Sequence, residues 1–168
     1  MPAAHLKGRL MTLEALENAQ KELKRADHLI FVSLKYTRTV DVIKNIVTRL
    51  LSVIDMGYEV LLRKGVDDKK LAEVPKLPRI RVDEVKRIYG GDPKIMQFID
   101  FYQLLRKIDK AQFDRKLEYR RHVTMTAHMN EEKIEITIDI ISDYFQRTKE
   151  FIHHVEEIVI GKPEEGEL

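Results

Sequence analysis

Apolar residues recur at intervals of three and four through most of residues 13–61, and this spacing restricts that part of the chain to long amphipathic helices. Thr12 is a suitable N-cap for a helix over residues 13–35, and Thr39 for a second helix that stops at Gly65. The apolar stripes are Leu13, Leu16, Ala19, Leu23, Ala26 and Ile30, then Ile43, Ile46, Val47, Leu50, Ile54 and Leu61. The polar break at residues 37–39 predicts two antiparallel helices, and one long helix kinked there is the alternative.

Residues 66–91 interrupt the helical pattern with Pro75, Pro78 and the pair Gly90-Gly91. Long structureless connections are uncommon in compact domains, so we predict a lid over the bundle or a mobile arm, with helical turns near residues 68–74 and 82–89. Asp92 and Pro93 then supply an N-cap and a first helical position. They predict a third long helix that continues toward Leu117.

Residues 122–140 alternate with a period of two, on both sides of a polar turn at Asn130. The alternating apolar residues are Val123, Met125, Ala127 and Met129, then Ile134, Ile136, Ile138 and Ile140. This pattern predicts a β-hairpin, and the alternative is a helix that uses Ile134, Ile138, Ile141 and Phe145. A last helix runs from about Ser142 to Gly161. The predicted fold is a mostly α antiparallel bundle of long helices, with the hairpin before the C-terminal helix, a single domain over residues 1–161 and an acidic tail over 162–168.

The composition excludes several classes of function. None of the 168 residues is cysteine, which removes disulfides, thiolate metal sites and cysteine nucleophiles. The histidines at positions 5, 28, 153 and 154 lack metal-ligand spacing, so we expect neither a metal nor another cofactor. With 43% hydrophobic and 35% charged residues, and no apolar run long enough to span a membrane, we expect a cytoplasmic protein without membrane contact. Sparse asparagine and abundant Lys, Arg and Glu are typical of growth at high temperature.

Basic residues concentrate between positions 104 and 122, although the net charge of the chain is only +2. The bases there are Arg106, Lys107, Lys110, Arg115, Lys116, Arg120 and Arg121, and three acids leave a local balance of +4. Phe113 and Tyr119 lie among them and could stack on nucleic-acid bases. A solvated helix face with interleaved ion pairs is the alternative interpretation. The segment predicts a basic helix that engages RNA.

The sequence contains no phosphate-binding glycine loop, dinucleotide fingerprint or nucleophile elbow. One spacing does suggest chemistry: Arg121 is followed by His128, late in a helical domain. Together with the pattern from Ala15 to Asp27, Tyr36, and residues 61–65, this resembles the HEPN family of helical-bundle proteins. Many HEPN proteins are metal-independent ribonucleases whose Arg and His act in a cleft between two protomers. The resemblance implies that Arg121 steadies a phosphate and that His128 acts as acid or base at a 2′-hydroxyl.

The local structure decides whether Arg121 and His128 share one site. Seven residues span about 10.5 Å along one face of a helix, but about 23 Å along a strand. From the missing catalytic signatures and the basic helix we predict first a non-enzymatic binding protein for RNA or a ribonucleoprotein, with a HEPN-like ribonuclease as the alternative and a protein-protein adaptor third. Broad apolar stripes, such as residues 30–32 and 50–54, also predict a homodimer.

Overall fold

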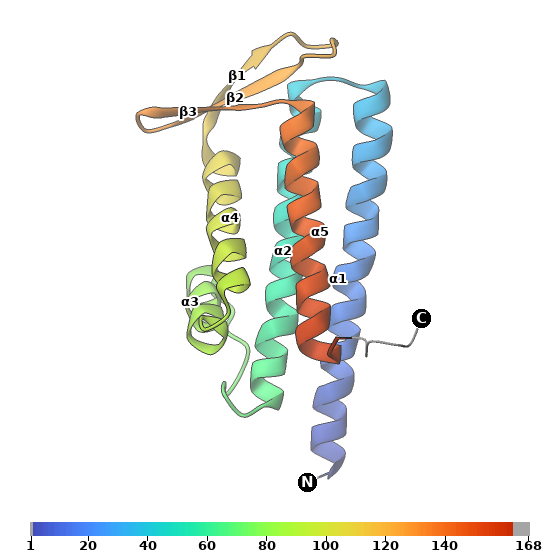
Figure 1. The fold of residues 1–168 in the computed structure, drawn as a ribbon, viewed down its shortest axis with the longest axis vertical. Coiled ribbons are helices and arrows are strands. Elements are labelled where there is room, and N and C mark those ends of the chain that lie inside the picture. The colour runs from blue at the N-terminus through green and yellow to red at the C-terminus, as the bar shows by residue number, and fades with distance from the viewer. Residues whose placement is uncertain (1, 163–168) are drawn as a thin grey trace.

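The computed structural model describes residues 2–162 and contains five helices and three strands in that range. The helices are α1 (Pro2–Tyr36), α2 (Val40–Asp67), α3 (Pro78–Tyr89), α4 (Pro93–Lys110) and α5 (Ile138–Ile160). The strands are β1 (Gln112–Lys116), β2 (Thr124–Met129) and β3 (Glu132–Ile136). The predicted fold of long packed helices, mostly α with strands before the last helix, is confirmed (Figure 1). Most of the predicted acidic tail lies outside the described residues.

α1 and α2 form the expected antiparallel pair, and they are two helices rather than one kinked helix (Figure 1). Thr39 begins α2 with an extended backbone, and its hydroxyl accepts a hydrogen bond from the Val42 amide at 3.3 Å. The predicted start of the first helix was wrong, because α1 begins at Pro2. Thr12 is therefore not a cap. It is buried within α1, and its hydroxyl donates to Asp67 Oδ2 at the end of α2, 2.6 Å away.

α2 is the central helix, and α1, α3, α4 and α5 all pack against it. Fourteen of its residues are buried, which explains why its apolar stripe is broad. α5 packs against α1 and α2, and Gly57 of α2 allows the ring of Phe151 to approach the α2 backbone. α5 begins at Ile138, before the predicted Ser142, because the hydroxyl of Thr137 caps it by accepting a hydrogen bond from the Ile140 amide at 3.3 Å.

The segment at 66–91 is more regular than the sequence predicted. Residues 78–89 form α3, which includes the expected turn at 82–89, whereas residues 68–74 form no helix. Val82 and Val85 are buried, and the Tyr89 hydroxyl donates to the Leu61 carbonyl of α2 at 2.6 Å. Arg81 also reaches α2 and lies 2.8 Å from Glu59. This segment is therefore attached to α2 through apolar and polar contacts.

The predicted hairpin at 122–140 is confirmed as β2 and β3, joined by a two-residue turn at Asn130 and Glu131. Asn130 has a φ of 50°, a left-handed conformation that asparagine tolerates better than most residues. Ile138 and Ile140, assigned to the hairpin from their alternation, belong to α5. The helical alternative is wrong for Ile134, which lies on β3, but Ile138, Ile141 and Phe145 do lie on a helix, α5.

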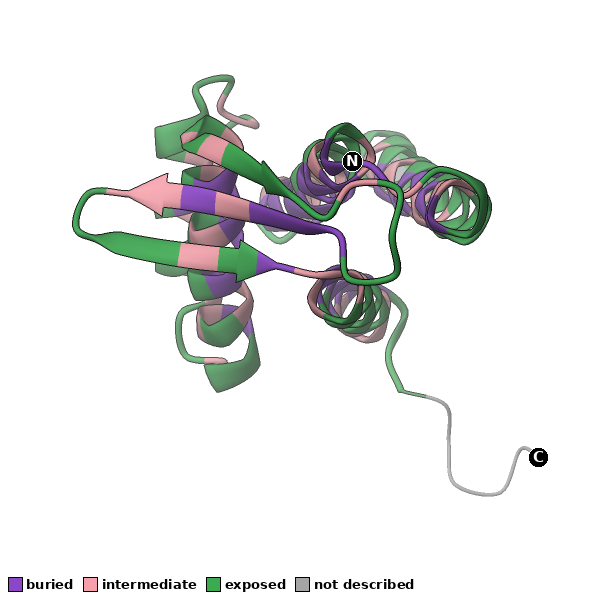
Figure 2. Cartoon of the chain, turned by 90° about the horizontal axis from the view of Figure 1, so that it is seen from above, coloured by how far each residue is buried: buried purple, intermediate pink, exposed green. Residues whose placement is uncertain are grey.

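The third predicted helix is too long. α4 ends at Lys110, and residues 112–116 form β1, which pairs antiparallel with β2 in the order β1-β2-β3. Seen from above, β2 carries most of the buried positions between two largely exposed edge strands (Figure 2). The inner face of the sheet contributes Met125, Ala127 and Ile136 to the core, so the sheet covers one end of the bundle (Figure 1).

Candidate nucleic-acid interface

The bases predicted to form one basic helix lie on three different elements. Arg106, Lys107 and Lys110 are on the last turns of α4, Arg115 and Lys116 are on β1, and Arg120 and Arg121 are in the loop before β2. The prediction of a basic helix was therefore wrong, because β1 replaces its second half. These side chains do not form one stripe, and their surroundings differ.

Arg115 is used by the fold. Its guanidinium lies 2.8 Å from Asp41 at the start of α2 and 3.6 Å from Glu118, and it stands over the Phe113 ring. The hydrogen bond from Arg115 holds the pKa of Asp41 below its ordinary value. This contact fastens β1 to the first turn of α2 and leaves Arg115 less able than its neighbours to bind an external anion.

The loop that joins β1 to β2 displays basic and aromatic side chains. Leu117 and Tyr119 have φ values of 55° and 64°, and the Tyr119 amide donates to the Arg38 carbonyl at 2.6 Å. Tyr119 itself is 79% exposed, and Arg120 and Arg121 are exposed beside it. The backbone bond attaches this loop to the junction between α1 and α2.

That junction adds residues that the sequence analysis did not assign to an interface. Tyr36 is 74% exposed, and Lys35 Nζ lies 5.6 Å from its ring centroid. Arg38 follows two residues later, and its Nε donates to the Leu34 carbonyl. The sequence pattern that could have identified these residues is an aromatic residue with bases on both sides at the predicted end of a helix. Nothing in the sequence indicates that this end meets the loop at 117–123.

We call this surface the basic aromatic end, and it consists of Lys35, Tyr36, Arg38, Lys116, Tyr119, Arg120 and Arg121. It lies where the α1–α2 connection and the β1–β2 loop approach each other above the helices (Figures 1 and 2). Three acids lie within three residues of this set: Asp41 and Glu118 contact Arg115, and Asp114 contacts His128. Five cations and two exposed phenol rings therefore share this end, and each of these acids already has a basic partner within the protein.

Arg121 and His128 do not meet within one chain. β2 runs from Thr124 to Met129, so Arg121 precedes its first residue and His128 lies near its last. Residues 124 and 128 alone are separated by about 13 Å of extended strand. His128 Nε2 instead lies 2.6 Å from Asp114 Oδ2 on the outer face of β1. The single-chain geometry that would let the two side chains share one phosphate is absent here.

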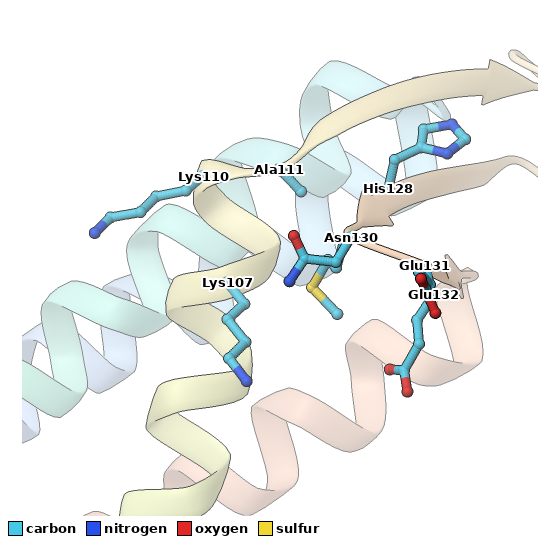
Figure 3. A pocket seen from close by; sticks show the side chains of 8 residues that line it. Lys107, Lys110, Ala111, His128, Asn130, Glu131 and Glu132 are labelled. Carbon is cyan, nitrogen blue, oxygen red and sulfur yellow. The ribbon is translucent and has the colours of Figure 1, made fainter.

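A cavity of about 680 Å³ lies beside His128, between the end of α4 and the β2–β3 turn (Figure 3). Lys107 and Lys110 border it from α4, Glu131 borders it from the turn, and Glu132 from the start of β3. The Lys110 side chain is directed away from the other lining residues (Figure 3), and the two acids offset Lys107, so the lining does not favour a polyanion. Within residues 2–162 there is no group of three or more His, Asp or Glu arranged to hold a metal ion.

The adjacent histidines on α5 have structural partners. His154 Nε2 lies 2.6 Å from Asp92 Oδ2, the residue that caps α4, and its ring stands 6.0 Å from the Phe98 ring. His153 is more exposed and lies 3.3 Å from Glu157. The pair therefore diverges as helical geometry predicts, and His154 connects α5 to the start of α4.

Comparison with known proteins gives no family assignment, because no family model, curated protein or solved structure matches this chain. No helix in the described part of the chain is long and apolar enough to cross a membrane.

Proposed function

We propose that this protein is a non-enzymatic binding protein for RNA, alone or within a ribonucleoprotein, and that the basic aromatic end is its binding surface. The observation that carries the proposal is the meeting of two loops that bring five cations and two exposed tyrosines together, while the acids nearest in sequence contact Arg115 and His128. Phosphate groups bind such cations with release of counterions, and unstacked bases bind to exposed aromatic rings.

The form of the surface favours single-stranded or looped RNA. Its side chains project from the end of α1, the end of β1 and the two loops that follow them, and Tyr36 and Tyr119 are 74% and 79% exposed. Proteins read unpaired RNA largely through stacking of splayed bases on aromatic rings and through contacts to the backbone. The surface supplies both kinds of contact on adjoining segments.

The salt dependence of binding tests the proposal. Fluorescence anisotropy of a labelled mixed-sequence single-stranded RNA should show affinity that falls steeply with salt. Arg120→Gln and Arg121→Gln should each reduce the slope of log K against log salt by about one, whatever the RNA sequence. Tyr119→Ala should weaken binding by about 1–3 kcal/mol with little change in slope, because stacking releases no counterion.

Lys7→Gln is the matched control, because Lys7 is an exposed base on the N-terminal part of α1, away from the basic aromatic end (Figure 1). It removes the same charge and should leave the slope unchanged. Salt-independent binding, or no binding to any RNA, would contradict the proposal and favour the protein-protein adaptor. The predicted homodimer is tested in the same preparations by light scattering, which distinguishes the monomer mass of 19.8 kDa from twice that value.

A HEPN-like ribonuclease is the alternative that an activity assay would reveal. A metal-independent reaction needs a base for the 2′-hydroxyl, and histidine has an ordinary pKa near neutrality. RNA cleavage in excess EDTA that disappears in His128→Ala, with RNA affinity retained, would replace the binding proposal by the enzymatic one. Because Arg121 belongs to both hypotheses, His128 is the residue that separates them.

A further inference from the structure

A second, separate surface is a groove between α2 and α4, closed at one side by the segment that precedes α3. It encloses about 560 Å³, a volume in the range of small-ligand pockets. Ser52 and Asp55 border it from α2, Tyr102, Arg106 and Lys110 from α4, and Lys76 from the segment before α3. We call this the α2–α4 groove.

The carboxylates of the groove already have partners. Asp55 Oδ1 accepts a hydrogen bond from the Tyr102 hydroxyl at 2.6 Å. Asp109 accepts from Lys44 Nζ at 2.7 Å and from the Thr48 hydroxyl at 2.9 Å. Burial, and after it the hydrogen bond to Asp55, raises the pKa of Tyr102 to about 12, so the phenol remains a donor at neutral pH. Both carboxylates therefore accept hydrogen bonds from side chains of the protein.

Three cations of the groove lack such partners. Among the described residues, Lys76, Arg106 and Lys110 form no ion pair with a carboxylate, whereas eleven such contacts of other Lys and Arg side chains occur. Arg106 and Lys110 are four residues apart on α4 and so lie on one face of the helix. Arg106 is positioned by Tyr102, with its guanidinium carbon 5.7 Å from the ring centroid.

The remaining base of the groove has a structural task. Arg81 lies 2.8 Å from Glu59, and its guanidinium also donates to the carbonyls of Pro75 and Asp55 at 3.2 Å and 3.3 Å. These bonds hold the segment that carries Lys76 against α2. They fix one side of the groove in the absence of any ligand.

We propose that the α2–α4 groove binds a small phosphomonoester. A guanidinium presents two parallel donors that match phosphate oxygens, and ammonium groups add charge without a directional requirement. Arg106 supplies the guanidinium, Lys76 and Lys110 supply ammonium groups from two sides, and Ser52 adds a hydroxyl. The volume admits the phosphate together with a sugar-sized group. The site is independent of the RNA interface and does not rest on it.

Calorimetric titration of the purified chain tests the proposal with ribose 5-phosphate, ribose and inorganic phosphate as probes. We expect ribose 5-phosphate to bind and ribose not to bind. Weaker binding of inorganic phosphate would show that the sugar contributes, and equal binding would show that the phosphate alone is recognised. Arg106→Gln should weaken ribose 5-phosphate binding at least tenfold, because it removes the bidentate donor pair.

Lys76→Gln guards against a folding effect, because Lys76 is exposed and lies outside the helices. It should weaken ribose 5-phosphate binding several-fold while the thermal midpoint stays unchanged. Arg120→Gln is the matched control at the basic aromatic end, and it should alter the RNA salt slope but not ribose 5-phosphate binding. The proposal is overturned if ribose 5-phosphate does not bind at millimolar concentration, or if it binds equally well to Arg106→Gln and Lys76→Gln. Neither result would affect the RNA proposal.

Discussion

Gly57 tests how tightly α5 is packed on α2, because helix propensity and packing predict opposite effects of Gly57→Ala. Alanine within a helix is more stable than glycine by about 0.5–1 kcal/mol. A Cβ at position 57 would, however, lie 2.5 Å from Cε1 and 3.1 Å from Cζ of Phe151, and 3.0 Å from Cδ1 of Ile152. Contacts that short require something to move.

Phe151 has little room to move. It is 1% exposed, and its ring is edge-on to Tyr58 at 5.6 Å and tilted against Phe98 at 5.3 Å. Inserting a methyl group into a well-packed core costs about 1–3 kcal/mol. With the ring held on two sides we take the upper half of that range. After subtraction of the helix-propensity gain, Gly57→Ala should lower the free energy of unfolding by about 1–2.5 kcal/mol.

Urea unfolding followed by circular dichroism at 222 nm measures this difference, and the thermal midpoint should fall by about 2–4 °C for each kcal/mol. Gly91→Ala is the matched control, because a Cβ there meets nothing within 4 Å and its φ lies outside the left-handed range. It should stabilise the protein by about 0.4–1 kcal/mol. A Gly57→Ala protein as stable as the wild type would refute the reasoning and show that Phe151 is free to shift.

Two further predictions concern buried polar groups. The Tyr58 hydroxyl is buried without a hydrogen-bond partner among the described residues, and burial raises its pKa. Because the mutation removes an unsatisfied polar group, Tyr58→Phe should raise the free energy of unfolding in urea by about 1 kcal/mol. A loss of stability would mean that the hydroxyl is hydrogen-bonded. Glu22 is 5% exposed, and the hydrogen bond from Arg49 is the main cause that lowers its pKa. The ionised Glu22 carboxylate therefore adds to the free energy of unfolding above its unfolded pKa of about 4.5. This stabilisation disappears as the pH falls through the lowered pKa of the folded state. The destabilisation by Glu22→Gln should shrink between pH 7 and pH 3, and a constant difference would contradict this assignment.

The sequence predicted those parts of the fold in which buried side chains recur with the period of a helix or of a strand. The stripe of α2 and the alternation of β2 are of this kind, because each apolar position faces the core. The start of α1 could not be found in this way. Leu6 and Leu10 are 59% and 58% exposed, and a long-range bond from Arg9 Nη2 to the Val159 carbonyl holds this part of α1 to α5. Such a contact leaves no local pattern.

β1 escaped prediction for a related reason. Its five residues are mostly charged and exposed, and Phe113 alone packs against the core. A charged segment after a helix favours continued helix on propensity, but the edge of β2 offers backbone donors and acceptors from Thr124 to His128 that pair with residues 112–116. Tertiary pairing therefore decides the structure here, as it often does for edge strands.

At the candidate site, too, the sequence identified the side chains but not where the fold places them. Arg120, Arg121 and Tyr119 were predicted from sequence, but their meeting with Arg38 depends on a loop with two residues in the left-handed region. Each such residue costs about 1–3 kcal/mol unless its surroundings hold it. Glycine at 117 or 119 would remove that cost, but it would also free the loop to adopt many other conformations. With Leu117 and Tyr119 in these positions, the bond from the Tyr119 amide to the Arg38 carbonyl holds the backbone that carries the two arginines beside the α1–α2 junction. A surface that binds a flexible polyanion gains from this restriction, because less side-chain and loop entropy is then lost on binding.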